Sequence, residues 1–329
     1  MTTAPHAAEP ARAPQCPFTV AARRAADAPA RVGTLLYGVV AYASFFFTIC
    51  YAIGFVGNWI VPKSIDSGTP GPLLTSLLIN AGLLSIFVVQ HTVMARPAFK
   101  RWWTRVIPAA IERSTFVIAA SASLLVIFGF WQPAPGTVWR VENGVGAGVL
   151  TAVSLAGWAT VFLSSFVINH FDLFGLRQVW VRFRGRVLEP VGFRLAGPYK
   201  LVRHPLMVGF LLAFWATPHM TVGHLFFAVM TTGYILMGIW FEERDLVAEH
   251  GENYLKYRRE VPALIPFSKN LTGQRVGAAA FLFFLVKGLV WLGVAGTAGY
   301  AAVRKADGFT SPTAAAIEAG THEGSMRTN

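Results

Sequence analysis

The stretch Pro205–Phe241, PLMVGFLLAFWATPHMTVGHLFFAVMTTGYILMGIWF, has no charged residue and is too long for one membrane-spanning helix. The segment 217–220 (TPHM) interrupts it, and a proline inside a helix removes a backbone hydrogen bond. We therefore predict a helical hairpin with a short first arm at Leu206–Ala216 and a full-length second arm at Val222–Phe241. At 1.5 Å per residue the first arm reaches about 17 Å, which falls short of a hydrocarbon core of roughly 30 Å.

The composition of the whole chain agrees with a membrane protein. Of its 329 residues, 54% are hydrophobic and 13% are charged, and its mean hydropathy is +0.50. Soluble proteins carry roughly 25% charged residues, about twice the share in this chain. A sequence this apolar and this poor in charge is a poor fit to the disordered and fibrous classes. The net charge of +12 would suit a nucleic-acid partner, but the basic residues lie between long uncharged stretches rather than on one solvated face.

Further windows are long enough to span a bilayer. Four of them lack Asp, Glu, Lys and Arg: Val32–Pro62, Pro72–Ala95, Ser114–Trp139 and Gly144–Asn169. A last window, Val276–Val303, contains the single charge Lys287 and is expected to span as well. The predicted fold class is all-α, a polytopic membrane helix bundle with a C-terminal helical hairpin and ligand-binding segments at its cytoplasmic end.

These windows divide the chain into five segments. We expect a disordered cytoplasmic tail (1–31), a four-span bundle (32–168), a core of connector, hairpin and amphipathic helix (169–267), an additional span (268–304) and a disordered tail (305–329). In the amphipathic part, Gly251 is expected to interrupt the helix and Pro262 to end it. Cys16 and Cys50 are the only cysteines, so the sequence predicts no disulfide framework, and no metal-ligand spacing is present.

The distribution of Lys and Arg predicts the orientation. Basic residues concentrate in the N-terminal tail, in the loop after the second span, in the connector 169–204 and in the segment 242–275. The loops that alternate with them hold only Lys63 and Arg140. The positive-inside rule then predicts a multi-pass protein of the cell (inner) membrane with its N-terminus and all basic loops in the cytoplasm.

The motif GPYKLVRHP (Gly197–Pro205) is the first candidate site. Gly197-Pro198 is typical of a turn, and Pro205 suits the first turn of the following helix. Arg203 and His204 then lie at a helix N-terminus, where free N–H groups and the dipole favour a bound anion. Arginine can also bind a carboxylate through two donors. The alternative is that Arg203 only flanks the membrane and His204 only caps the helix.

The second candidate site is Glu242-Glu243 at the end of the second arm. Carboxylates are disfavoured at a helix C-terminus, so we expect a cation nearby, either Arg203 across the hairpin or a bound ligand. Ordinary interfacial charge, satisfied by Arg244 or water, is the alternative. Both motifs flank the same hairpin and are therefore expected to leave the membrane close together.

A third group lies in NHFDLFGLRQVW (Asn169–Trp180). Its aromatic residues suit a membrane interface, whereas His170, Asp172 and Arg177 are polar groups at one depth that a ligand can use. A simple interfacial anchor explains the aromatic residues equally well. Three further histidines are predicted to be structural: His91 has an interfacial or bundle-facing position, and His219 and His224 belong to the hairpin turn.

The motif pair resembles the isoprenylcysteine carboxyl methyltransferase superfamily of integral-membrane methyltransferases. The resemblance is carried by GPYKLVRHP, EERDL (Glu242–Leu246) and HGENYLKYRREVP (His250–Pro262). Three more stretches resemble its bacterial methanethiol S-methyltransferase family: QHTVMARPAFKRWWTRVIPAAIERSTF (Gln90–Phe116), NHFDLFGLRQVW and FWATPHMTVGHLFFAVMTTGYIL (Phe214–Leu236). The similarity extends from about Arg31 to Phe267.

The resemblance implies transfer of a methyl group from S-adenosyl-L-methionine to methanethiol, giving dimethyl sulfide. The cofactor-binding residues that follow from it and from the motifs above are Gly197, Pro198, Tyr199, Arg203, His204, Pro205, Glu242, Glu243 and Arg177. One departure is Met207, where many relatives have tyrosine, so no aromatic cofactor contact is carried over to that position.

The chemistry needs a thiolate, because a thiol with a pKa near ~8.5 is mostly protonated at neutral pH. A cationic pocket lowers that pKa, and a neutral imidazole can accept the proton. The predicted catalytic residues are Arg203, for the cofactor carboxylate or the thiolate, and His204 or His170 as the base. The ring of Tyr199 is expected to pack on the adenine or the sulfonium.

Other functions are compatible with the same sequence. A methyltransferase acting on another small thiol or on a lipid-borne acceptor keeps the site and changes only the acceptor. A non-catalytic membrane transporter or assembly protein, or more distantly a membrane reductase, would bind no S-adenosylmethionine. Transport would favour charges at midspan, and Lys287 is the only one there in the predicted spans.

Overall fold

The computed structural model describes residues 27–189 and 196–266. Within them, five helices are long and apolar enough to cross a membrane: α2 (Ala28–Gly57), α3 (Leu73–Ala95), α5 (Ala109–Phe130), α6 (Gly144–Ile168) and α10 (Val222–His250). The shorter elements are α4 (Pro97–Trp103), β1 (Thr137–Arg140), α7 (His170–Leu173), α8 (Leu176–Phe183), the 3-10 helix η1 (Gly197–Lys200), α9 (Pro205–Trp215), β2 (His219–Thr221) and α11 (Glu252–Glu260). The predicted all-α polytopic bundle is confirmed. The expected span Val276–Val303 lies outside the described residues.

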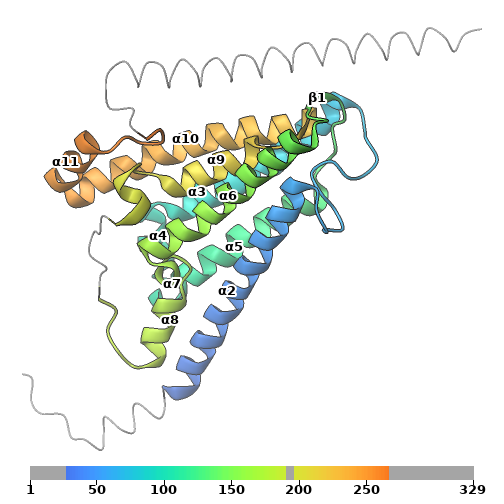
Figure 1. The fold of residues 1–329 in the computed structure, drawn as a ribbon. Helices are drawn as coiled ribbons and strands as arrows, with labels where there is room; N and C mark the ends of the chain where they lie inside the picture. The colour runs from blue at the N-terminus through green and yellow to red at the C-terminus, as the bar shows by residue number, and fades with distance from the viewer. Residues whose placement is uncertain (1–26, 190–195, 267–329) are drawn as a thin grey trace, which may run out of the picture.

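The long helices run between two different ends of the bundle (Figure 1). One end carries the ribbon β1–β2, in which Trp139 pairs with Met220, and we call it the hairpin end. The other carries α4, α7, α8 and α11, and we call it the basic end. Charged residues are common at the basic end, whereas the large side chains exposed along the helices are mostly apolar, as a lipid-facing surface requires.

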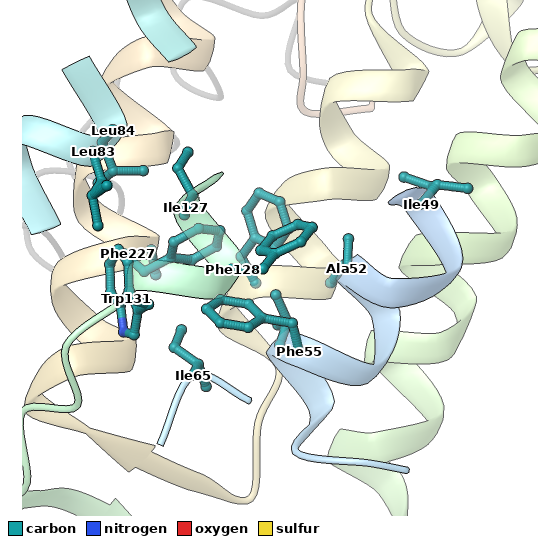
Figure 2. Close-up of a cluster of buried hydrophobic side chains, with 14 of the residues drawn as sticks. Ile49, Ala52, Phe55, Ile65, Leu83, Leu84, Ile127, Phe128, Trp131 and Phe227 are labelled. Atoms are coloured by element: carbon teal, nitrogen blue, oxygen red, sulfur yellow. The ribbon is translucent and has the colours of Figure 1, made fainter. Parts of the chain in front are cut away.

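The best-packed apolar core lies toward the hairpin end (Figure 2). Phe55 of α2, Phe128 of α5 and Phe227 of α10 meet there, and Trp131 is fully buried beside them. The ring centroids of Phe55 and Phe128 are 4.8 Å apart. This core joins α2, α5 and α10 far from the charged motifs and leaves the basic end for polar contacts.

The third span differs from its predicted window of Ser114–Trp139. The helix α5 begins at Ala109 and includes Glu112 and Arg113, which the search for uncharged windows left out. It ends at Phe130, and Thr137–Arg140 forms β1 instead of helix. The prediction was wrong at both ends because a helix near a membrane surface can include charges and because hydropathy does not distinguish a strand from a helix.

The predicted hairpin is confirmed, and a non-helical link adds to the length of its short arm. The 11 residues of α9 are about 16 Å long, and the non-helical link 216–221 adds up to roughly 20 Å of extended chain. Pairing of β2 with β1 satisfies backbone groups of this link. The Thr221 hydroxyl accepts from the backbone of His224 and lies 2.5 Å from a carboxylate oxygen of Asp66.

The second arm is longer than expected. After the uncharged stretch ends at Phe241, α10 continues to His250, and the predicted break occurs at Gly251 with φ of 53°. Glu242 and Glu243 therefore lie inside the helix, and the prediction that they sit at its C-terminal dipole was wrong. No helix-breaking residue stands between Phe241 and Gly251, which explains the extension. Leu246, the last residue of the EERDL motif, belongs to α10 as well.

Two glycines bring α6 and α9 into direct backbone contact. A Cβ atom at Gly157 would lie 2.6 Å from the Gly209 carbonyl oxygen, and one at Gly209 would lie 2.7 Å from the Gly157 oxygen. The hydroxyl of Ser154 donates to the carbonyl of Ala213 across the same contact (3.0 Å). Small residues allow this approach in a membrane bundle, and it fixes the position of α9, which carries the Arg203-His204 turn at its start.

Candidate functional site

The turn before α9 presents Arg203 and His204 at the basic end. His204 is the N-cap residue of α9 and Pro205 opens the helix, as predicted. The turn is tied to the chain after α11, because the Arg203 N–H donates to the Pro262 carbonyl (2.8 Å) and the His204 N–H to the Ala263 carbonyl (3.1 Å). The two motifs that flank the hairpin are therefore joined through their backbones.

Arg203 links three parts of the site. Its Nε donates to Oε1 of Glu243 (2.7 Å), and Nη2 lies 2.5 Å from the same oxygen. Its Nη1 donates to the carbonyls of Val261 (2.5 Å) and Arg258 (3.1 Å). The side chains of Arg203 and Glu243 are only 10% and 14% exposed. The expectation that Arg203 lies across the hairpin beside the acidic pair is confirmed for Glu243.

His204 lies between the two carboxylates. Its Nε2 is 3.2 Å from Oε1 of Glu243 and its Nδ1 is 3.5 Å from Oε2 of Glu242. Burial by itself lowers the pKa of His204, but the two carboxylates outweigh it and hold the pKa above its ordinary value. Because each ring nitrogen faces a carboxylate oxygen, and both nitrogens can donate only when the ring is protonated, this arrangement favours the cation. The Glu242 side chain is half exposed, so it faces outward from the cluster.

The 3-10 helix η1 forms the outer edge of the site. Gly197 has φ of 52°, a left-handed conformation that glycine adopts without strain, and Pro198 follows it. The Tyr257 hydroxyl of α11 donates to the Tyr199 carbonyl (2.7 Å). Burial, together with Glu242 and Tyr257, raises the pKa of the Tyr199 phenol, so this ring stays neutral beside the acidic pair.

His170 belongs to a different environment, between α6 and α2. Its Nε2 is 2.8 Å from the Tyr42 hydroxyl and its Nδ1 is 2.8 Å from Oγ of Ser165. Because the Ser165 hydroxyl donates to the Phe162 carbonyl, it accepts from Nδ1–H, which leaves Nε2 to accept from Tyr42. Burial lowers the pKa of His170. Its contacts in the described chain include neither Arg203 nor His204.

Arg177 is also separate from the Arg203 cluster. Its Nη1 lies 3.0 Å from the Asp172 carboxylate, and its Nη2 donates to the Glu189 carbonyl (2.6 Å). The side chains of Arg177 and Asp172 were expected to lie at one depth, and they form an ion pair that joins α7 to α8. The structure thus brings together Gly197–Pro205 with Glu242 and Glu243 but leaves His170 and Arg177 outside.

Some groups that form the site were not predicted from the sequence. The carbonyls of Arg258, Val261 and Pro262 accept from Arg203, and the phenol of Tyr257 holds η1. Backbone acceptors carry no side-chain signature. The only available signal was Pro262, which ends α11 and so turns the preceding carbonyls toward the Arg203 turn.

The chain is similar to several curated proteins. It is 53% identical over 248 residues to "Methanethiol S-methyltransferase 2" of Bradyrhizobium diazoefficiens, covering 75% of this chain and 95% of the relative. It is 50% identical over 234 residues to "Methanethiol S-methyltransferase" of Mycobacterium tuberculosis, covering 71% and 96%. A more distant relative is "Nurim" of Bos taurus, 26% identical over 183 residues and covering 53% and 69%.

No family model and no solved structure matches the chain. The two methyltransferases are matched over nearly their whole length, well beyond the local motifs. The Nurim similarity fits the wider isoprenylcysteine carboxyl methyltransferase-like superfamily, to which the motif pair pointed. The chain belongs to the methanethiol S-methyltransferase family.

Proposed function

We propose that this protein transfers the methyl group of S-adenosyl-L-methionine to methanethiol and releases dimethyl sulfide. One observation carries the proposal: the Arg203-His204 turn and the Glu242-Glu243 pair lie within 3.5 Å of each other at one end of an apolar bundle. The names of the relatives add the reaction and the acceptor.

The residues of the cluster fit the chemistry of that methyl donor. S-adenosylmethionine supplies an electrophilic methyl group on a sulfonium, and it also carries an ammonium, a carboxylate and an adenine. The half-exposed carboxylate of Glu242 suits the ammonium, while the N-terminus of α9 with cationic His204 suits the carboxylate. The ring of Tyr199 offers a face for the adenine or the sulfonium.

Arg203 has a second role in this proposal. Its contacts with Glu243, Val261 and Arg258 hold the turn, α10 and α11 in one arrangement. We therefore propose that Arg203 positions the site and offers its remaining N–H to the ligand carboxylate. Much of the acceleration of an in-line displacement comes from holding the two reactants in the right geometry, and a rigid frame serves that purpose.

The two histidines predicted as bases differ in charge. His204 is favoured as a cation, which suits binding an anion and does not suit accepting a proton. His170 is favoured as neutral, and proton acceptance at its Nε2 requires the Tyr42 hydroxyl to turn away. Of this pair, only His170 has the charge state of a base, but it lies outside the Arg203 cluster, and we propose His204 as an electrostatic partner of the cofactor.

The basic end is proposed to face the cytoplasm of the inner membrane. Basic residues at this end include Arg31, Arg96, Lys100, Arg101, Arg105, Arg182, Arg184, Arg186, Lys200, Arg258 and Arg259. The loops of the hairpin end contribute Lys63 and Arg140. The positive-inside rule then places the N-terminus and the site inside the cell, where S-adenosylmethionine is made.

Purified protein in lipid nanodiscs tests the proposal with methyl-labelled S-adenosylmethionine and methanethiol. Labelled dimethyl sulfide is expected in the headspace, and the variants Glu242→Gln and His204→Gln are expected to raise the KM for the donor. Arg259→Ala is a matched control, because that side chain is 67% exposed and its ion pair within the described residues is with Glu252 at 3.5 Å. Absence of labelled product from folded protein refutes the activity, and unchanged donor KM in both variants refutes the site.

Other acceptors are compared in the same assay. Ethanethiol and a lipid-borne thiol, each competing with methanethiol, separate the proposed acceptor from the alternatives. A higher kcat/KM for either competitor would reassign the acceptor while leaving the methyl donor and its site unchanged.

A further inference from the structure

A second polar group lies inside the bundle, between α3, α5 and α10, and the proposed cofactor site does not use it. Its centre is the His91 imidazole, which is surrounded by aromatic rings. Ring centroids lie 5.0 Å away for Phe87, 4.8 Å for Phe116 and 6.3 Å for Tyr234. The Nδ1 atom of His91 is buried, and no hydrogen-bond partner for it exists among the described residues.

Other polar side chains next to His91 in sequence or space do have partners. The Ser123 hydroxyl lies 3.4 Å from Oε1 of Gln90, and the Thr92 hydroxyl lies 3.4 Å from the Tyr234 hydroxyl. Polar groups in a membrane bundle are costly and mark functional sites by default. His91 differs from these neighbours because its buried ring nitrogen has no partner among the described residues.

Two guanidinium groups lie near this cluster of rings. The Arg113 Cζ lies 5.1 Å from the centroid of Phe116, the same ring that His91 contacts, and its Nε donates to the Leu173 carbonyl. Arg96 lies over Phe241 of α10 (4.6 Å) and pairs with Asp245 (3.2 Å), and its buried Nε has no partner within the described chain. The His91 cluster is thus aromatic around the imidazole and positive at its rim.

We propose that the acceptor thiol binds at this aromatic cluster and that Nδ1 of His91 accepts its proton. The inference rests on the proposed function and adds the acceptor site to it. A small alkyl thiol is nearly apolar, so aromatic walls suit its methyl group, and a single acceptor suits its S–H. Positive charge at the rim stabilises the thiolate that forms.

Comparison with the other buried histidines supports this assignment. His204 is engaged by two carboxylates, and His170 has hydrogen-bond partners on both nitrogens. His224 also has a buried Nδ1 without a partner, but its Nε2 lies 2.9 Å from the Phe214 carbonyl at the hairpin end. In the described chain, His91 alone combines an unpartnered ring nitrogen with a position toward the basic end.

The position along α10 is compatible with the proposed cofactor site. Tyr234, which contacts His91, precedes Glu242 by about two helical turns, or roughly 12 Å. A donor anchored near Glu242 must therefore extend along the bundle to meet a thiol beside His91, and S-adenosylmethionine is an extended molecule.

The proposed reaction transfers one proton to His91 and one methyl group to the thiol sulfur. The S–H proton moves to Nδ1 of His91, the thiolate sulfur forms a bond to the methyl carbon, and the bond from that carbon to the donor sulfur breaks with its electron pair. The products are dimethyl sulfide and a neutral thioether, and the imidazolium then releases the proton to water.

Variants at His91 test this role against a series of acceptors. General-base catalysis contributes about 100-fold or more, so His91→Gln is expected to lower kcat/KM for methanethiol by that factor. A more acidic thiol such as trifluoroethanethiol is expected to lose much less, because it ionises without help. Binding of labelled S-adenosylmethionine, measured without any acceptor, is expected to be unchanged. His219→Gln, at the hairpin end, is the matched control.

Chemical modification supplies a readout that needs neither a variant nor turnover. Ethanethiol is expected to protect His91 of the wild-type protein from diethyl pyrocarbonate, as measured by mass spectrometry, and to leave His219 unprotected. Equal losses for acidic and ordinary thiols, or equal modification with and without ethanethiol, overturn the inference. Both results leave the proposed function standing, which fails only if the wild-type protein makes no dimethyl sulfide.

Discussion

Arg203 and Glu243 form the ion pair on which the site geometry depends most directly. Both side chains are largely buried, and the guanidinium also satisfies two carbonyls of the α11 region. Removing Arg203 leaves the buried Glu243 carboxylate with the weaker contacts of His204 (3.2 Å) and Arg258 (3.6 Å), and removing Glu243 leaves the guanidinium without its carboxylate. The free energy of unfolding should therefore respond far more to this pair than to ion pairs on the surface.

Arg203→Ala is expected to lower the free energy of unfolding by about 3 kcal/mol, because Glu243 and two carbonyls lose their donor. Adding Glu243→Gln should cost less than the sum of the two single changes, with a coupling of about 1 kcal/mol or more. Thermal unfolding in detergent measures both values. The exposed pair Arg259–Glu252 is the control, and strict additivity at Arg203–Glu243 would contradict the expected coupling.

His204 predicts a pH dependence of stability. Its pKa is raised in the folded state, so its stabilising charge is fully present below the ordinary value of about 6.5 and is lost as the pH rises through the folded value. The stability difference between wild type and His204→Gln is thus expected to be largest on the acid side of neutrality and to shrink at alkaline pH. Thermal midpoints across that range measure it.

The control for this pH dependence uses the carboxylates. In a Glu242→Gln, Glu243→Gln background, burial is the main influence left on His204, so the His204→Gln difference should no longer grow toward acid pH. A difference that grows with rising pH in the native background would mean that the imidazole is held neutral.

At the level of elements, the contact of α6 with α9 determines where the Arg203 turn lies. Gly157→Ala places a methyl group 2.6 Å from backbone atoms of α9, so the helices must separate. Overpacking of this kind costs about 1–3 kcal/mol, and methyl transfer should fall with it because α9 carries His204 at its N-cap. Gly209→Ala is expected to act in the same way, from the other side of the contact.

Gly148→Ala, also in α6, is the matched control. A Cβ there meets no described atom within 4 Å, so stability and activity should be unchanged. Thermal unfolding and headspace dimethyl sulfide are measured for all three variants. Equal effects of Gly148→Ala and Gly157→Ala would show that the loss of glycine itself, and not the helix contact, is responsible.

Comparison of elements also shows what the sequence could and could not predict. The hairpin and the break at Gly251 follow from local patterns, so they were predictable. The closeness of Arg203 and Glu243 was predictable as well, because a hairpin returns its ends to one place. The start of α5 at Ala109 could not be predicted, because the charged residues Glu112 and Arg113 interrupt the uncharged window that was used to find the span.

Long-range packing was beyond the reach of those patterns. The approach of Gly157 to Gly209 and the carbonyls of Val261 and Pro262 depend on how separate elements dock. His91 was expected to be structural, because nothing in its neighbourhood of the sequence shows that its ring nitrogen lacks a partner.

At the scale of the whole molecule, the two ends differ in charge and in construction. The hairpin end is closed by the β1–β2 ribbon and the aromatic core, whereas the basic end holds the short helices and the Arg203 cluster (Figure 1). Successive helices of the bundle run in opposite directions between these two ends, in the order α2, α3, α5, α6, α9 and α10. If each end lies on one side of the membrane, the side on which one end lies determines the orientation of every span.

Single-cysteine labelling tests that orientation. With Cys16 and Cys50 replaced by serine, Ile60→Cys lies at the hairpin end, where Ile60 is fully exposed, and Arg259→Cys lies at the basic end. A membrane-impermeant maleimide is expected to label Ile60→Cys in intact spheroplasts, and Arg259→Cys only in inverted vesicles, because basic loops are retained in the cytoplasm. The reverse pattern would place the proposed site outside the cell, and labelling of both positions from one side would contradict the spanning bundle itself.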